Sequence, residues 1–471
     1  ISMKLVYGVK DRPKLGRLIV FAIQQLLAIM AATLVVPVIT NNTTGSEMSP
    51  AAALLGAGVG TLVYVLFTKA KSPVFLGSSF AFLGSMAAAF AGASTMALGY
   101  LGLILGAVFA GLVYVVIAII VKLVGVKWVN KLMPAVVIGP TVSIIGLSLA
   151  GNAINDLQTA NAGGDKLIAV LCGLVTLAVT ILCSVYGKKM MKLIPFIMGI
   201  LAGYAVAAVF TVIGNATGND ALKVIDFSVF EGLLVDGKVA LSTFLAVPNF
   251  TFVDAFGAFG ELSGSYIASI AVAYVPVAFV VFAEHIADHK NISSIIETDL
   301  LEDPGLSRTL LGDGVGSIAG ALFGGCPNTT YGESVGCVAI TGNASVLTII
   351  AAAIGAIIIA FLSPFVAFVN SIPSCVMGGV CVALYGFIAV SGLKMIQKVD
   401  LGDNRNLFVV STILIVGIGG LALTFGKITI TSIATALILG ILVNVMCGGG
   451  KKAAAKTSSD AQEEKSETVS K

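Results

Sequence analysis

The chain has 471 residues, of which 57% are hydrophobic and only 11% are charged, and its mean hydropathy is +1.03. Soluble domains carry about 25% charged residues, so this composition excludes a soluble globular protein and predicts an all-α polytopic membrane protein. The net charge of +3 is too small to indicate nucleic-acid binding. The seven cysteines form no CxxC pair, so we expect no disulfide framework, and we expect no cofactor.

Fourteen apolar segments predict transmembrane spans, each about 20 residues long. The first is too long for a cleavable signal peptide. The segments lie near residues 18–39, 50–68, 73–91, 98–121, 133–150, 167–186, 194–213, 266–289, 308–325, 327–342, 345–362, 373–393, 407–424 and 428–447.

Positively charged residues fall in alternate loops, whereas residues 41–50 and 92–99 contain no Lys or Arg. Loops rich in Lys and Arg stay in the cytoplasm, so we expect a multi-pass protein of the cell membrane with both termini cytoplasmic. Residues 1–17 would be the cytoplasmic N-terminus, and residues 449–471, which have no apolar face, a disordered cytoplasmic tail. The charged loops carry Lys69 and Lys71, Lys122, Lys127 and Lys131, Lys188, Lys189 and Lys192, Lys290 and Arg308, and Lys394, Lys398 and Arg405.

Two internal matches indicate a duplication. Met133–Gly139 parallels Ile372–Gly378, and Ser78–Phe82 parallels Thr329–Glu333. Both pairs start the second half near residue 266. Because seven spans per half is an odd number, the halves would be inverted repeats, which are typical of transporters with a site at the bilayer midplane.

The third and tenth segments contain Gly, Pro and Ser or Thr within apolar sequence, at Gly77-Ser78-Ser79 and at Gly324-Gly325-Cys326-Pro327. This pattern favours unwound backbone, which membranes tolerate only inside protein or beside a cavity. The alternative is a close glycine-lined contact between two helices.

Two acidic residues interrupt apolar sequence, Glu284 in the eighth segment and Glu333 in the tenth. A charge at bilayer depth costs about 2.5–3.5 kcal/mol, so we expect both to bind substrate and one to carry a proton. The alternative is that each is a structural carboxylate bonded to backbone amides or tyrosines.

The only two histidines, His285 and His289, have the i,i+4 spacing that can bind zinc, but the order Glu-His-x-x-Asp-His differs from HExxH. A solvated helix end or a proton route with Asp288 and His289 is favoured over a metal site. Gln25 in the first span is either functional or a bridge between helices.

The motifs resemble the nucleobase–ascorbate transporter family, and within it the bacterial uracil permeases. The matching stretches are Gln24–Pro37, Leu76–Phe82, Ala283–His289, Asp303–Leu306, Pro327–Glu333 and Val376–Gly386. They run in family order along nearly the whole chain, and Asn-Thr-Thr-Tyr-Gly-Glu is the most specific. Xanthine and purine members usually carry glutamine there, so Glu333 favours uracil.

The resemblance implies fourteen spans in two inverted seven-span repeats, with short antiparallel strands in broken spans 3 and 10. Spans 1–4 and 8–11 would form a core domain, residues 18–125 and 266–363. Spans 5–7 and 12–14 would form a gate domain, residues 126–214 and 364–448. Residues 215–265 would be an extracellular linker. A homodimer is also implied.

For the site, the resemblance implies that Glu284 and Glu333 bind the pyrimidine edge while backbone amides near Phe80 and Gly332 bind its carbonyls. Phe80 and Tyr331 would shape the ring pocket, and Tyr385 and Cys381 match gate positions near the substrate. One well-known member carries histidine at the positions of Asp288 and Gln25, so its imidazole proton route does not carry over unchanged. Asp288 and Gln25 are candidates for the proton route here, together with Glu284, Glu333 and His289.

The sequence therefore predicts proton-coupled import of uracil by alternating access, by a transporter and not an enzyme. A purine or xanthine permease of the same family is the nearest alternative. An anion transporter or channel with a similar inverted repeat is a second, although two acids at the site argue against it. An intramembrane metalloenzyme using His285, His289 and Glu284 is a third.

Overall fold

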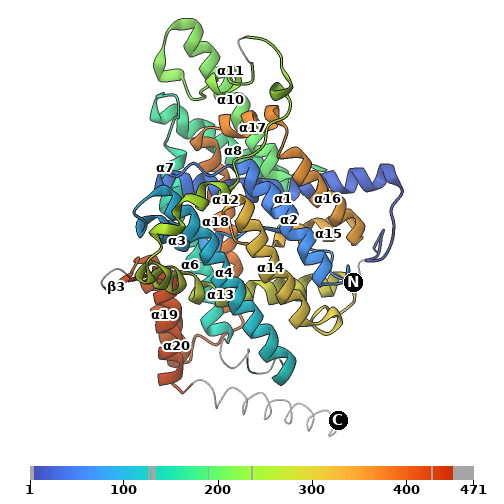
Figure 1. Ribbon diagram of the computed structural model, residues 1–471, viewed down its shortest axis with the longest axis vertical. Helices are drawn as coiled ribbons and strands as arrows, with labels where there is room; N and C mark the ends of the chain where they lie inside the picture. Colours follow the sequence, from blue (N-terminus) through green and yellow to red (C-terminus); the bar gives the residue numbers. More distant parts are fainter. Residues whose placement is uncertain are drawn as a thin grey trace.

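The computed structural model describes residues 5–125, 128, 134–188, 190–234, 237–425 and 428–448 and consists mainly of helices (Figure 1). The expected tail 449–471 lies outside the described residues, as do Lys127, Lys131 and Lys189. Within the described part, eight helical segments are long and apolar enough to cross a membrane. They are α1 (Leu15–Thr44), α2 (Pro50–Phe67), α4 (Met96–Val124), α6 with α7 (Ala135–Ser148, Ala150–Leu157), α8 (Lys166–Tyr186), α10 (Pro195–Thr217), α13 (Gly264–Ile296) and α18 (Ser374–Ile396).

Shorter helices complete the fold, and each of the fourteen apolar segments contains a helix. A helical polytopic membrane protein is thereby confirmed. The shorter helices are α3 (Leu83–Ala91), α14 (Leu306–Gly324), α15 (Gly332–Thr341), α16 (Val346–Ile359), α17 (Ser363–Ser371), α19 (Asn404–Ile418) and α20 (Ser432–Met446). The shortest elements are η1 (Phe80–Phe82), α9 (Met190–Leu193), η2 (Asp220–Leu222), α11 (Ser228–Glu231), η3 (Leu241–Thr243), α12 (Thr251–Ala255), η4 (Phe256–Glu261) and η5 (Leu301–Gly305).

Two short strands replace helix in the third and tenth segments, as the resemblance implied. Strand β1 (Leu76–Ser78) pairs antiparallel with β2 (Asn328–Thr330), and Gly77 lies opposite Thr329. Flanking bonds from Ser79 N to the Pro327 carbonyl (2.9 Å) and from Tyr331 N to the Phe75 carbonyl (3.2 Å) extend the ladder. The helical part of each segment, η1–α3 and α15, therefore begins only after its strand.

The helices pack in two groups. In the first, α2 contacts α1, α14 and α16, while α4 contacts α3, α13 and α14, and α15 lies against α1 and α13. In the second, α18 contacts α6, α7, α8 and α10, while α19 contacts α6 and α20. Contacts of α13 with α6 and α20, and of α1 with α10 and α18, join the two groups. We name them the first and second helix groups.

Glycines allow the closest approach within the first group. A Cβ atom on Gly56 of α2 would lie 2.5 Å from the carbonyl oxygen of Gly320 on α14, and one on Gly60 would lie 2.6 Å from that of Gly316. The Asn328 amide fits beside these glycines and donates to the Gly56 carbonyl (3.1 Å). The α2–α14 contact therefore also fixes strand β2.

The structure differs from the predicted segments at two places. Helix α13 continues to Ile296, beyond the expected end near residue 289. In addition, a second strand pair, β3 (Leu423–Phe425) with β4 (Ile428–Ile430), lies where the segments 407–424 and 428–447 were expected to be helical. Gly419 and Gly420 end α19, and the β-branched run Ile428–Thr431 favours extended backbone.

Residues 5–11, which we name the N-terminal strap, pair with the loop between α15 and α16. Val6 N donates to the Gly342 carbonyl (2.8 Å), Ala344 N to the Tyr7 carbonyl (2.9 Å) and Val346 N to the Val9 carbonyl (3.1 Å). This part of the expected N-terminal segment is thus built into the first helix group.

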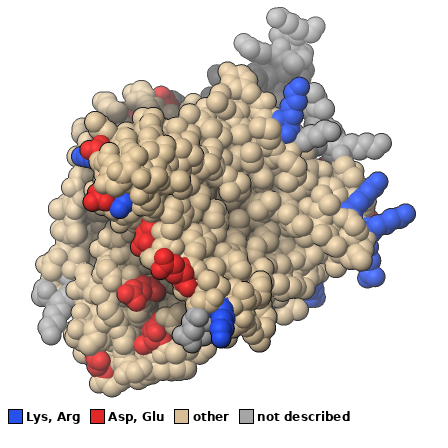
Figure 2. Space-filling model, turned by 90° about the horizontal axis from the view of Figure 1, so that it is seen from above, with Lys and Arg blue, Asp and Glu red and all other residues tan. Residues whose placement is uncertain are grey.

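Charge is distributed unevenly over the surface. In the face that Figure 2 presents, most exposed Lys and Arg residues gather on one side and most Asp and Glu residues on the other. This asymmetry agrees with the alternation of basic loops along the sequence.

We expect Gly56→Ala to destabilise the protein, because the added methyl group meets backbone of α14 that cannot move without separating the helices. Overpacking of this kind costs about 1–3 kcal/mol. The melting temperature in detergent should fall by several degrees. Gly336→Ala in α15 is the matched control, since nothing lies within 4 Å of its Cβ position. Equal melting temperatures for the two variants would contradict this account of the α2–α14 contact.

Candidate functional site

A cavity of about 430 Å³ lies between the two helix groups, beside the β1–β2 pair. We name it the central cavity. The first group contributes Ser79, Phe80, Ala283, Glu284, Ala287, Asp288, Asn291, Thr329, Thr330, Tyr331, Gly332 and Glu333. The second group contributes Val142, Phe196, Leu384, Phe387, Ile388, Ser391 and Met395.

Three carboxylates line this cavity. Glu284 and Asp288 are one helical turn apart on α13, and Glu333 lies in the first turn of α15. The Asp288 carboxylate accepts a hydrogen bond from the Thr330 hydroxyl (2.8 Å), which ties α13 to β2. Glu284 lies within electrostatic range of Asp288 and Glu333. The structure therefore brings together the two acids that the sequence singled out, and adds Asp288 to them.

Two helix N-termini also meet at the cavity. Helix α15 begins at Gly332, and η1 begins at Phe80 and leads directly into α3. The first N–H groups of a helix have no partner within the helix and carry partial positive charge. The site thus combines carboxylates, which accept hydrogen bonds, with the free backbone N–H groups at the two helix starts, which donate them. This combination suits a neutral ligand that has both donors and acceptors on its edge.

Two aromatic side chains from the broken segments complete the cavity wall. The Tyr331 hydroxyl donates to the Ser78 carbonyl (2.7 Å), and a Cβ atom on Gly77 would collide with the Tyr331 ring. Gly77 is therefore needed to let this ring lie across β1. Phe80 lies edge-on to the ring of Tyr385, with 6.1 Å between ring centroids.

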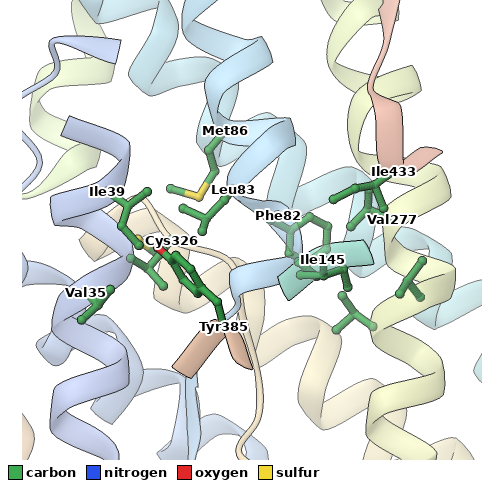
Figure 3. Close-up of a cluster of buried hydrophobic side chains, with 14 of the residues drawn as sticks. Val35, Ile39, Phe82, Leu83, Met86, Ile145, Val277, Cys326, Tyr385 and Ile433 are labelled. Atoms are coloured by element: carbon green, nitrogen blue, oxygen red, sulfur yellow. The ribbon is translucent and has the colours of Figure 1, made fainter. Parts of the chain in front are cut away.

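Cys381 and Tyr385 do not line the central cavity. Both are buried in α18, and Tyr385 lies among apolar side chains that include Val35, Ile39 and Cys326 (Figure 3). Tyr385 reaches the site only through its contact with Phe80. The neighbouring turns of α18 present Leu384, Phe387 and Ile388 to the cavity instead.

The two histidines lie on a different face of α13 from the acids, because neighbouring residues of a helix point about 100° apart. Both are fully buried, and their rings stack with 4.0 Å between centroids. The expectation of a solvated helix end is wrong, since α13 continues past His289 and packs inside the first group. Their contacts are His285 Nδ1 to Asp313 (2.7 Å), His285 Nε2 to Thr309 (3.0 Å), His289 Nδ1 to the His285 carbonyl (2.7 Å) and His289 Nε2 to the Tyr64 hydroxyl (2.7 Å).

These contacts occupy both nitrogens of each imidazole. The part of the chain that the structure describes contains no group of three His, Cys, Asp or Glu residues able to hold a metal ion. Asp313 also accepts from Thr329 of β2 (3.5 Å). The histidine network thus lies behind the strand pair and supports it, and the structure does not bring His289 to the cavity.

Gln25 supports the site without touching the cavity. Its amide donates to the Ser334 hydroxyl, which in turn accepts from Phe75 N (2.9 Å). These bonds join α1, the first turn of α15 and the residue before β1. This arrangement matches the alternative in which Gln25 bridges helices. Because Ser334 directly follows Glu333, the same bonds fix the first turn of α15, which carries Glu333.

Sequence reasoning missed several residues of the site. Asp313 is fully buried in α14, between Gly312 and Gly314. It carried the same signal that singled out Glu284, a carboxylate within an apolar segment, and could have been found. Asn291 and Ser391 at the cavity wall carried no such signal, because isolated polar residues near helix ends are common.

Known proteins resemble this chain over nearly its whole length. The sequence model of the permease family matches residues 16–425. The uracil permease of Bacillus caldolyticus is 38% identical over 454 residues, which cover 96% of both chains. The uracil permease of Escherichia coli strain K12 is 34% identical over 438 residues, covering 92% of each.

Among solved structures, the transmembrane domain of the cyanobacterium bicarbonate transporter BicA superposes with a TM-score of 0.57 at 15% identity, covering 93% of this chain and 99% of that one. SLC26A9 superposes with a TM-score of 0.59 at 11% identity, covering 92% of this chain and 66% of that one. At these identities the likeness shows the fold alone. The sequence matches are decisive, and the chain belongs to the permease family, whose members aligned here are transporters rather than enzymes.

Proposed function

We propose that this protein imports uracil across the cell membrane together with protons. The observation that carries the proposal is the central cavity, in which Glu284, Asp288 and Glu333 lie beside two helices that begin within the fold. Uracil permeases that are 34–38% identical over more than nine-tenths of the chain support uracil as the substrate.

The chemistry of the cavity wall matches a pyrimidine ring with N–H donors and carbonyl acceptors on its edge. Glu284 and Glu333 accept from the ring N–H groups, and backbone N–H groups near Phe80 and Gly332 donate to the carbonyls. Gly332 lets the ligand approach the start of α15, because only Asp288 lies near its Cβ position (3.8 Å). Phe80 and Tyr331 flank the ring.

The number of acids at the cavity supports proton coupling. Three carboxylates in one membrane cavity repel one another, and a neutral ligand does not cancel their charge. A proton taken up by this cluster relieves the repulsion and leaves an O–H donor for the ligand. Glu284, Asp288 and Glu333 are therefore the proposed proton carriers. Gln25 and His289 hold the elements that position them.

The two helix groups support alternating access, and we assign them as core and gate domains of a fourteen-span inverted repeat. The cavity wall reaches Asn291 on α13 and Met395 on α18, which lie beside the basic residues Lys290 and Lys394. Because basic loops stay in the cytoplasm, this end of the cavity would face inward, and both termini would be cytoplasmic. A homodimer is proposed from the family resemblance.

Replacing either central acid by its amide should abolish or uncouple transport. We expect Glu284→Gln and Glu333→Gln to lower uptake of labelled uracil about 100-fold or more. An amide cannot take up or deliver a proton, and only one of its two terminal atoms accepts a hydrogen bond, whereas both oxygens of a carboxylate do. Any remaining uptake should no longer depend on external pH.

Glu302→Gln is the matched control, because it makes the same change at an exposed position in η5. It should leave uptake and its pH dependence unchanged. Full, still pH-dependent uptake by both site variants would refute the assignment.

The nearest alternative is a purine or xanthine permease. Because Glu333 stands in the Asn-Thr-Thr-Tyr-Gly-Glu motif, we expect unlabelled uracil to compete with labelled uracil at far lower concentration than xanthine does. If xanthine competed at the lower concentration instead, the substrate would be a purine, and the fold and the site would stay as described.

An anion transporter of similar fold is the alternative from another class. The structural neighbours include a bicarbonate transporter. Three acidic side chains at the cavity disfavour an anion, which would be repelled unless all were protonated. A ligand that binds the folded protein raises its melting temperature. We therefore expect uracil, but not bicarbonate, to raise the melting temperature of the purified protein, and the opposite result would favour the anion transporter.

A further inference from the structure

Helix α1 makes two polar contacts across to the second helix group, to which α9 also belongs because it packs on α8 and α10. Toward its C-terminal end, the Asn42 amide donates to the carboxylate of Asp156 at the end of α7 (3.2 Å). Toward its N-terminal end, the Gln24 amide donates to the Met190 sulfur of α9 (2.8 Å), while the Gln24 carbonyl oxygen is buried without a partner. A thioether is a weak acceptor. The contact at Asn42 is thus the stronger of the two.

The two residues of the stronger contact belong to segments that neighbouring contacts fix, although the Asn42 side chain itself is exposed. The end of α7 packs directly on α18, because a Cβ atom on Gly378 would meet the backbone of Asp156 and Leu157. Asp156 is buried, with 6% of its surface exposed, and moves with the second group. On the other side, Asn41 bonds both the N–H and the carbonyl of Met48 (2.8 and 2.9 Å), which fixes the end of α1.

Apolar side chains fill the space between the groups on this side of the central cavity. Phe82, Leu83 and Val277 of the first group pack with Ile145, Tyr385 and Ile433 of the second (Figure 3). Ile39, one helical turn before Asn42, belongs to the same cluster. We name these residues the apolar seal.

Beyond the seal lies a smaller cavity of about 180 Å³, whose wall includes Phe80, Gly84, Ser148 and Thr431. Phe80 belongs to the walls of both cavities. Leu149, also in the wall, immediately precedes α7. The smaller cavity borders the seal through Leu83 and Ile433 and adjoins the start of α7, the helix that carries Asp156, whereas the acids, Asn291 and Ser391 line the central cavity.

We propose that the Asn42–Asp156 hydrogen bond is a latch that holds the extracellular closure of the transport path. Burial of the apolar seal favours contact between the two helix groups but does not fix their relative position, because burial of apolar surface is non-directional. The hydrogen bond between Asn42 and Asp156 requires a set distance and angle, and it therefore fixes that position. The latch rests on the proposed function, since it requires the two groups to move apart during transport.

A latch must be made in the outward-closed state and broken in the outward-open state, and the Asn42–Asp156 bond meets this requirement under the proposal. In the closed state Asp156 is buried and its carboxylate bonds the Asn42 amide. When the groups separate, water replaces each partner. Removing the amide therefore destabilises the closed state more than the open state.

The first test measures access from outside to a cysteine in the central cavity. Ile388→Cys places the reporter, and a membrane-impermeant maleimide is added to intact cells. We expect Asn42→Ala and Asp156→Ala to raise the labelling rate roughly three- to tenfold, the ratio that corresponds to the typical net value of one hydrogen bond. The chain without Ile388→Cys, treated equally, corrects for the native cysteines.

Asp156→Asn is the matched control, because an amide oxygen still accepts from Asn42 although the charge is gone. It should label nearly as slowly as the parent. Unchanged labelling in Asn42→Ala, or labelling of Asp156→Asn as fast as Asp156→Ala, would overturn the proposal.

The second test closes the latch covalently. Asn42→Cys combined with Asp156→Cys should be joined by a short bis-methanethiosulfonate cross-linker, which spans the gap that the two side chains fill; cross-linking should stop uracil uptake, and reduction should restore it. The two single variants are the controls. Uptake that continues after cross-linking would overturn the latch. If uracil neither stabilised the parent protein nor was transported by it, the proposed function itself would be contradicted. The two failures are therefore distinguishable.

Discussion

The rest of the site depends on the backbone hydrogen bonds between β1 and β2. Membranes exclude unpaired backbone, because each lost N–H or C=O partner costs several kcal/mol in hydrocarbon. The two broken segments meet this constraint by pairing with each other, with Leu76 opposite Thr330 and Ser78 opposite Asn328. Each strand is therefore stable only in the presence of the other. The pairing leaves η1–α3 and α15 free to begin at the cavity.

Side chains on both faces of the strand pair secure it. Behind it, Asp313 bonds His285 and Thr329 and links α13, α14 and β2. In front of it, Thr330 bonds Asp288, so the same strand also positions a cavity carboxylate. The strand that positions a cavity acid is thus itself held by a polar network that lies outside the cavity wall. Mutations in that network would alter transport by displacing the strands.

Much of this arrangement could be predicted from sequence, since charges and glycines in apolar segments are costly and therefore informative. Glu284, Glu333 and the breaks near Gly77 and Gly325 were found in this way. The orientation of α13 was harder, because His285 differs from Glu284 by one position yet lies on the buried face. Tyr385 was expected at the cavity, but its place depends on how α18 packs against Phe80. The β3–β4 pair was missed since its residues are as apolar as a span.

The N-terminal strap has a consequence for how the protein is made. Residues 5–11 are synthesised long before their backbone partners, which lie at 342–346. The strap cannot dock until most of the chain has been synthesised and inserted. Until then its N–H and C=O groups must be hydrated, and the core cluster that Leu5 and Val9 later join is uncovered. The first helix group is therefore completed by a segment that is synthesised before any of its helices.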